Sequence, residues 1–185
     1  VEREDIKHPE LKCLQGMSPE VTEGQYPDAK PGKFFLTSTK ETHPSPLRVI
    51  VVHHHRSRYK PLDPEIKNDQ LCISKDAIRG TVYGFCSDCE YAEWGADRTP
   101  PRCSLSHNYV SLTQAGPALT RFNRTSFKAG QDFASSCKLS IPRKPLWGYA
   151  TIIQSVAATA KVKGKDVTYY KMGIAWDRSQ PTDES

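Results

Sequence analysis

Four cysteines spaced C-x13-C-x2-C-x13-C restrict what this 185-residue chain can fold into more than any other feature of its sequence. They are Cys72, Cys86, Cys89 and Cys103. A C-x2-C turn places two thiolates on one side of a small loop, and two flanking cysteines at equal distances complete a tetrahedral zinc site. We therefore expect residues 72–103 to form a small module held by one structural zinc ion (Zn2+). His107, four residues after Cys103, is an alternative ligand in place of either outer cysteine.

Two other interpretations of the cysteines are disulfides in a secreted protein and a redox-active C-x2-C pair. Six cysteines in 185 residues is a low density for a disulfide scaffold, and the charged residues 1–12 do not resemble a signal peptide. No β-α-β pattern of the thioredoxin kind surrounds the pair. Structural zinc is therefore favoured. Cys13 and Cys137 lack partners at ligand spacing and are expected to be buried free thiols.

Most of the remaining chain has the alternation and the β-branched content of strands. The expected strands are residues 34–39, 47–59, 108–113, 117–123, 149–161 and 167–176. One helix is expected between the Thr125-Ser126 cap and Cys137, ahead of Pro142 and Pro145. The order approximates that of the OB-fold, so we predict a mainly β protein: an OB-like five-stranded barrel with one helix and an inserted small zinc module. Because six strands are expected, a generic β-barrel with one helix is the alternative.

The domain organisation follows from the turn formers and the composition. Residues 1–32 contain several proline-based turns and are expected to be an extended N-terminal arm. Residues 33–176 form the OB-like domain, with the zinc-binding insert at about 72–103. Residues 177–185 are polar and are expected to be a flexible tail.

The positive charge of the chain is concentrated in its last third. The whole chain has a net charge of +5, whereas residues 119–171 contain ten basic and two acidic side chains. Clustered cations attract phosphate groups, although a solvated basic face is the alternative. No apolar run approaches the length of a membrane span, so we expect no membrane partner.

Cations alternate with aromatic side chains in several segments, as in proteins that bind single strands by phosphate contacts and base stacking. The candidate nucleic-acid-binding residues are Arg56, Arg58, Tyr59, Arg121, Arg124, Lys128, Lys144, Trp147, Tyr149, Lys161, Lys163 and Lys165. Tyr59, Trp147 and Tyr149 are the preferred stacking residues. The strand pattern is expected to place the lysines at 161, 163 and 165 on one face.

Three consecutive histidines lie toward the end of the strand expected at residues 47–59. Alternation places His53 and His55 on one face and His54 on the other face with Arg56 and Arg58. No Asp or Glu lies beside them in the sequence, so a polar strand end or phosphate contacts are favoured over a catalytic metal site. There is also no phosphate-binding glycine-rich loop, serine elbow or HExxH motif.

The cysteine quartet between expected barrel strands, the basic-aromatic run from Arg121 to Lys128 and the final lysine-rich hairpin resemble bacteriophage single-stranded-DNA-binding proteins. The nearest architecture is the helix-destabilising protein of T-even phages, an OB-fold with a small zinc subdomain. The similarity covers residues 33–176. That family uses one histidine and three cysteines for zinc and ends in a strongly acidic tail, whereas residues 179–185 contain only two acidic side chains.

The resemblance implies a non-catalytic protein that coats and protects single-stranded DNA in replication or recombination, in the cytoplasm of a bacterial host. Replication or recombination proteins are its expected partners. One alternative is a zinc-ribbon transcription or replication accessory factor that binds a polymerase or helicase. A second is a metal-dependent nuclease that uses His53, His55 or His107.

Overall fold

The protein is seen in a computed structural model that describes residues 9–141, 144–162 and 164–177. The strands are β1 (Leu11–Cys13), β2 (Phe34–Leu36), β3 (Glu41–His43), β4 (Leu47–Lys60), β5 (Cys72–Ser74), β6 (Arg79–Gly80), β7 (Gly84–Phe85), β8 (Ser104–Thr113), β9 (Gly116–Asn123), β10 (Ala150–Val162) and β11 (Lys165–Trp176). The α-helices are α1 (Pro19–Thr22) and α2 (Phe127–Leu139). Three 3-10 turns, η1 (Glu90–Ala92), η2 (Arg124–Ser126) and η3 (Leu146–Gly148), complete the described elements.

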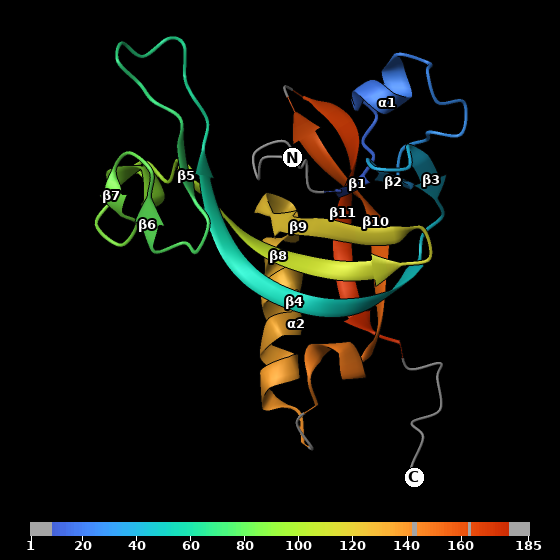
Figure 1. Ribbon diagram of the computed structural model, residues 1–185. Helices are drawn as coiled ribbons and strands as arrows, with labels where there is room; N and C mark the ends of the chain where they lie inside the picture. The colour runs from blue at the N-terminus through green and yellow to red at the C-terminus, as the bar shows by residue number, and fades with distance from the viewer. Residues whose placement is uncertain (1–8, 142–143, 163, 178–185) are drawn as a thin grey trace, which may run out of the picture.

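The central sheet has the strand order β11-β10-β4-β8-β9, and all of its neighbouring strands are antiparallel (Figure 1). The long strand β4 connects its parts, because its beginning pairs with β10, most of its length pairs with β8, and its end also pairs with β5. A separate sheet of order β1-β2-β3 and the small β6-β7 pair lie outside it. The expected mainly β class is confirmed, and the strands expected at 108–113 and 117–123 and at 149–161 and 167–176 form two antiparallel hairpins.

The predicted closed five-stranded barrel is wrong, because the described sheets are open. Strands β9 and β11 form the two edges of the central sheet and do not pair with each other. The chain before β1 meets β9 at a single bridge between Glu10 and Leu119. On the other edge, the Gln15 side chain bonds both the N–H and the C=O of Tyr170, at 2.9 and 3.0 Å. These contacts occupy the edges without closing a barrel.

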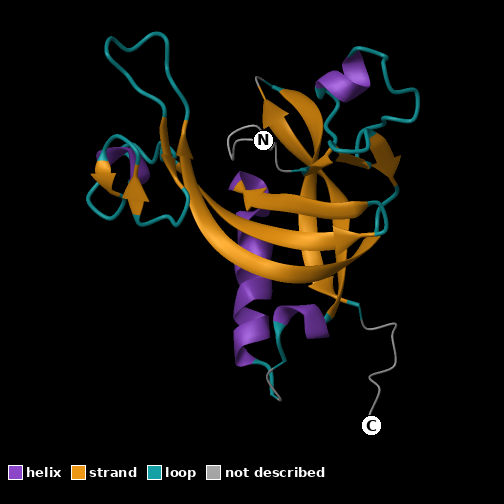
Figure 2. Cartoon of the chain, in the orientation of Figure 1, coloured by secondary structure: helices purple, strands orange, loops and turns teal. Residues whose placement is uncertain are grey.

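Helix α2 packs against one face of the central sheet and closes the main core (Figure 2). Its buried Phe133 lies edge-on to Tyr109, with ring centroids 5.6 Å apart. The Tyr109 hydroxyl donates a hydrogen bond of 2.5 Å to the Gly130 carbonyl. Ser126, expected to cap the helix, does not: its hydroxyl accepts a hydrogen bond from the Met172 N–H at 2.9 Å and so connects the helix start to β11.

The described part of the expected arm, residues 9–32, contains β1 and α1 and contacts the domain along its length. β1 pairs with β2, and the Ser155 hydroxyl donates to the Gly32 carbonyl at 2.5 Å. Gly32 has a positive φ of 85°, and a Cβ there would lie 2.6 Å from the Tyr170 ring. Of the expected tail, only residue 177 is described, and residues 178–185 lie outside the described part of the chain. No helix among the described residues is long and apolar enough to cross a membrane.

Candidate functional site

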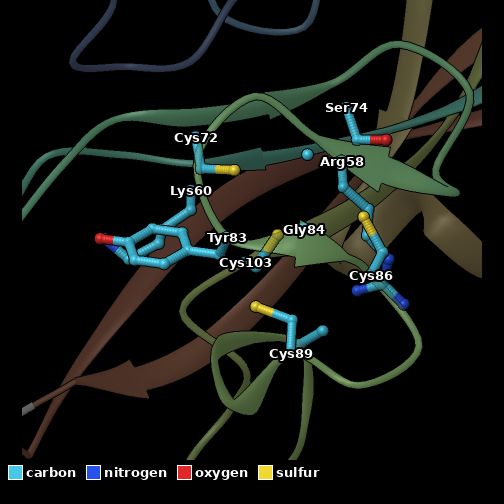
Figure 3. Close-up of a pocket in the computed structure, with 11 residues that line it drawn as sticks. Arg58, Lys60, Cys72, Ser74, Tyr83, Gly84, Cys86, Cys89 and Cys103 are labelled. Carbon is cyan, nitrogen blue, oxygen red and sulfur yellow. The ribbon is translucent and has the colours of Figure 1, made fainter.

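The four spaced cysteines line one small cavity of about 10 Å³ in the insert, shown in Figure 3. Cys72 begins β5, Cys86 and Cys89 form the turn after β7, and Cys103 directly precedes β8. A volume near 10 Å³ is roughly that of one water-sized sphere. The fold therefore brings together, around a space for one atom, cysteines that lie up to 31 positions apart in the sequence.

The surroundings of the thiols differ from one to the next. Burial raises the pKa of the Cys72 thiol, but the backbone N–H groups of residues 81–83 and the Thr81 hydroxyl together outweigh burial, so the net pKa is below its usual value. A Cβ at Gly80 would lie 2.6 Å from the Cys72 sulfur, so only glycine permits this approach. Burial raises the pKa of Cys103, and the nearby thiols of Cys86 and Cys89 raise it further, against the opposing charge and hydrogen bond of Arg58.

The donor set fits zinc in kind and number. Four cysteines are the ligands of closed structural zinc sites, and all six cysteines are free thiols in this structure. The sulfurs surround the cavity without converging on one point: among the described residues, no group of three or more His, Cys, Asp or Glu side chains is placed to hold a metal ion. His107 does not line the cavity, because it lies on β8 with its Nδ1 2.9 Å from the Nε2 of His54.

A buried ion pair connects the insert to the end of β4, and no pattern in the sequence points to it. The fully buried Lys60 ammonium lies 2.5 Å from the Asp69 carboxylate and 4.6 Å from the Tyr91 ring centroid. Arg102 pairs with Asp69 at 3.3 Å and with Asp63 at 2.9 Å. Burial would lower the pKa of Lys60, but the hydrogen bond and charge of Asp69 raise it above its usual value.

The candidate residues at the end of β4 are separated by the alternation of the strand. Arg56 is exposed. Arg58 is half-buried, lines the cysteine cavity and bonds to Cys103. Tyr59 points to the opposite face, where it is 48% exposed and lies across from Ile73 of β5. The structure therefore does not bring Tyr59 together with the two arginines.

The basic-aromatic run from Arg121 to Lys128 separates into an exposed and a buried set. Arg121 pairs with Glu10 at 2.7 Å, and Lys128 pairs with Asp132 at 3.6 Å. Arg124 is exposed at a positive φ of 44°. The aromatic residues of the run pack inward, because Phe122 is fully buried and the half-buried Phe127 packs on His107, with ring centroids 4.9 Å apart. The run therefore exposes cations without an aromatic stacking surface.

A cleft of about 420 Å³ lies between β4, the end of α2 and η3. It is lined by His54, Ala134, Cys137, Lys138, Lys144, Pro145 and Leu146. Trp147, next to the lining residue Leu146, is 65% exposed. Of the candidates in this segment, Lys144 lines the cleft together with Lys138, which sequence reasoning missed, whereas Trp147 is not among the lining residues. A signal for Lys138 was present, because it lies one helical turn after the buried Ala134.

Tyr149, the third candidate residue of the segment at 144–149, has a structural role within the chain. Its ring stacks on Trp176 with centroids 5.1 Å apart and an interplanar angle of 12°. Its hydroxyl bonds to the Ser140 hydroxyl and accepts the Lys144 N–H at 3.0 Å. Tyr149 therefore holds the loop that carries Lys144 and Trp147, and its ring is already stacked within the chain.

Two of the histidines, His54 and His107, form a neutral, partly buried pair beside the lysines of the cleft. As alternation predicts, His53 and His55 stack on one face and His54 lies on the other, 4.7 Å from the Tyr109 ring centroid. Burial first, then repulsion from His107, Lys138, His55 and His53, lowers the pKa of His54 to about 4. Burial, then Arg56 and Lys138, also lower the pKa of His107. The cleft is therefore a region of positive potential that favours an anion.

The lysines of the last hairpin do not share one face, which corrects the expectation from simple alternation. Lys161 lies across from Asp166, whereas Lys165 lies across from Val162, so the turn places the two lysines on opposite faces. Lys163 lies outside the described residues.

Comparison with known proteins gives one match. Residues 1–60 match a family model described as Pam3 phage gp34-like protein, which points to a bacteriophage protein. The match covers less than half of the chain and includes β1 to β4. No curated protein and no solved structure matches the chain.

Proposed function

We propose that this protein binds single-stranded DNA, with the cleft between β4, the end of α2 and η3 as the principal site. The observation that carries the proposal is that Lys138 of α2 and Lys144 of the following loop line one cleft, with the exposed Trp147 one residue after the lining Leu146. Lysines neutralise the phosphate backbone, and an exposed indole provides a surface on which an unstacked base lies. A duplex offers no such base, so single strands are the preferred ligand.

The surroundings of the cleft support this assignment. The low pKa of His54 reflects, besides burial, the positive potential of the neighbouring cations, which no described carboxylate lining the cleft offsets. The match of residues 1–60 to a phage family model supports a bacteriophage context for this role. The protein has no catalytic role in this proposal, because binding and protection of the strand require only contacts.

Binding of oligo-dT, followed by fluorescence anisotropy at several salt concentrations, tests the proposal. We expect Trp147→Ala to weaken binding by about 1–3 kcal/mol, the range for one base-aromatic stack. We expect Lys138→Ala/Lys144→Ala to reduce the salt slope by about 1.4, since each phosphate contact on a single strand contributes about 0.7.

The matched control is Lys67→Ala/Lys75→Ala, which removes the same charge from two exposed positions, one just before the insert and one within it, and should leave the slope unchanged. Circular dichroism and thermal melting verify that each variant is folded. Equal effects of the two lysine pairs, or no binding of oligo-dT at low salt, would contradict the proposal. A parallel titration with oligo-rU compares DNA with RNA.

We also propose that the four cysteines of the insert hold one structural zinc ion. The ion would cross-link β5, the turn after β7 and the start of β8, with Cys72, Cys86, Cys89 and Cys103 as ligands. Metal analysis of purified protein should find one zinc per chain, and Cys86→Ser/Cys89→Ser should abolish it. Cys13→Ser, outside the cavity, should retain it. Protein that is folded and metal-free, with a melting temperature unaffected by a chelator, would contradict this assignment.

A further inference from the structure

The insert exposes an unusual number of large apolar side chains. Of the nineteen exposed large hydrophobic residues among those described, five lie in the insert and three more in the segment at residues 61–71 that precedes it. Phe85 and Trp94 are the largest of these, with 56% and 68% of their surface exposed. Clusters of exposed aromatic residues on a domain mark contact sites for other macromolecules.

The same part of the insert is mainly acidic. Residues 80–97 contain four acidic and no basic side chains, and the flanking Arg79 places its guanidinium 5.6 Å from the Phe85 ring centroid. We define the knuckle surface as the exposed residues Phe85, Asp88, Glu90, Glu93 and Trp94, around the C-x2-C turn. Carboxylates repel the phosphate backbone, so this surface is unsuited to DNA and suited to a basic, apolar protein surface.

A surface with the opposite charge and a similar apolar character lies on the β10–β11 hairpin. Its two strands pair Val156 with Lys171, residue 158 with Tyr169, residue 160 with Val167 and Val162 with Lys165, so these residues share one face. We define the ribbon face as Val156, Val162, Lys165, Val167, Tyr169 and Lys171. The three valines are each 45–51% exposed, and the Lys171 ammonium lies 5.9 Å from the Tyr169 ring centroid.

The other face of the hairpin already has a partner within the chain. Tyr170 packs on Gly32, and the Ser155 hydroxyl donates to the Gly32 carbonyl. The ribbon face is the opposite side of the hairpin, and its three exposed valines show that it faces solvent. These valines are poor contacts for phosphate or for stacked bases, so a protein surface is the better match.

We propose that the knuckle surface of one copy of this chain docks on the ribbon face of the next copy. Acidic and aromatic residues on one surface meet basic and aliphatic residues on the other. The insert and the hairpin project separately from the molecule (Figure 1), so one chain presents both surfaces at once. Because the two surfaces differ, the contact is head-to-tail and builds an open chain of copies rather than a closed dimer.

Sedimentation velocity in the absence of DNA tests the proposal independently of the DNA-binding function. Wild-type protein should form a concentration-dependent series of oligomers that dissociates at high salt. The knuckle variant Phe85→Ser/Trp94→Asp and the ribbon variant Lys165→Glu/Lys171→Glu should each associate about tenfold more weakly or not at all, the effect expected from loss of hot-spot residues. Circular dichroism verifies the fold of both.

An equimolar mixture of the two variants gives the decisive result. The intact knuckle surface of the ribbon variant can dock on the intact ribbon face of the knuckle variant, so the mixture should form heterodimers and stop there. A ribbon variant that still self-associates would show contacts elsewhere and overturn the proposal. Wild-type protein that stays monomeric at low salt and high concentration would also overturn it, including the case in which the knuckle surface binds only a different protein.

Discussion

At the scale of single residues, Gly130 sets how closely α2 approaches the sheet. A Cβ at this position would lie 2.7 Å from the Cβ of Phe122 and 3.0 Å from that of His107. Alanine is the better helix former by about 1 kcal/mol, but overpacking costs about 1–3 kcal/mol. We therefore expect Gly130→Ala to lower the free energy of unfolding, measured by urea denaturation. Gln131→Ala, on the exposed side of α2, should change it by less than about 0.5 kcal/mol.

The ion pair between Lys60 and Asp69 should make the fold sensitive to acid. The hydrogen bond from Lys60 is the main cause that lowers the pKa of Asp69 to about 2, against the opposing effect of burial. A lowered carboxyl pKa stabilises the fold fully above its unfolded value, near 4, and the contribution is lost as the pH falls through about 2.

Urea midpoints measured at intervals between about pH 5 and pH 2 should therefore fall less steeply for Lys60→Met/Asp69→Leu than for wild type. Asp69→Asn alone should destabilise the protein more than the double variant, because it leaves the buried Lys60 ammonium without its partner. Parallel slopes for wild type and the double variant would show that Asp69 does not titrate as described.

At the scale of elements, the local pattern was sufficient for the long strands and the helix but not for their assembly. β4, both long hairpins and α2 follow from alternation, β-branched content and the turns between them. Nothing in the sequence indicates the register shift between Val51 and His53. The face of β4 that packs on the core after this shift therefore could not be predicted. Closure of the barrel depends on which distant edges pair, and the segment at residues 9–15 contacts both edges instead.

The candidate sites show the same contrast between local motifs, which the sequence indicates, and long-range contacts, which it does not. The C-x2-C spacing was enough to predict that Cys86 and Cys89 lie on one turn, because this motif is local, and the two flanking cysteines line the same cavity. The cleft combines a helix residue, Lys138, with a loop residue, Lys144, and a strand residue, His54, and their approach depends on how α2 packs. In the sequence, aromatic residues that alternate with cations, such as Phe122, resemble a base-stacking surface. In the structure Phe122 is buried in the core, so no base can stack on it.

The insert provides a further prediction at this scale, at Gly80. Any side chain there would collide with the Cys72 sulfur, because its Cβ would lie only 2.6 Å from that atom. We expect Gly80→Ala to displace this thiol and to speed the release of the proposed zinc ion to a chromogenic chelator. Gly16→Ala, where a Cβ would meet nothing within 4 Å, is the matched control. Equal release rates for the two variants would show that Cys72 is not a ligand.

At the scale of the whole molecule, charge is divided between two regions. The insert and the segment before it, residues 61–103 together, contain eight acidic and five basic side chains, although the chain as a whole has a net charge of +5. The remaining chain therefore contains 21 basic and 13 acidic side chains, and two of its lysines, Lys138 and Lys144, line the cleft. His54 is the titratable group that reports this potential. It faces His53 and His55 of its own strand, His107 of β8, Lys138 of α2 and the cleft that also contains Lys144.

Binding of a phosphate in the cleft should therefore be coupled to proton uptake by His54. In the free protein, burial first and then repulsion from His107 and Lys138 keep the pKa of His54 at about 4, so it is neutral near pH 7. An anion beside Lys138 offsets the repulsion and raises this pKa, so the bound state takes up more protons than the free state. Affinity for oligo-dT at constant ionic strength should rise as the pH falls from about 7.5 to about 5.5. His54→Asn should flatten this rise, whereas His43→Asn, on β3, should keep it; an identical pH profile for wild type and His54→Asn would exclude His54 as the coupled group.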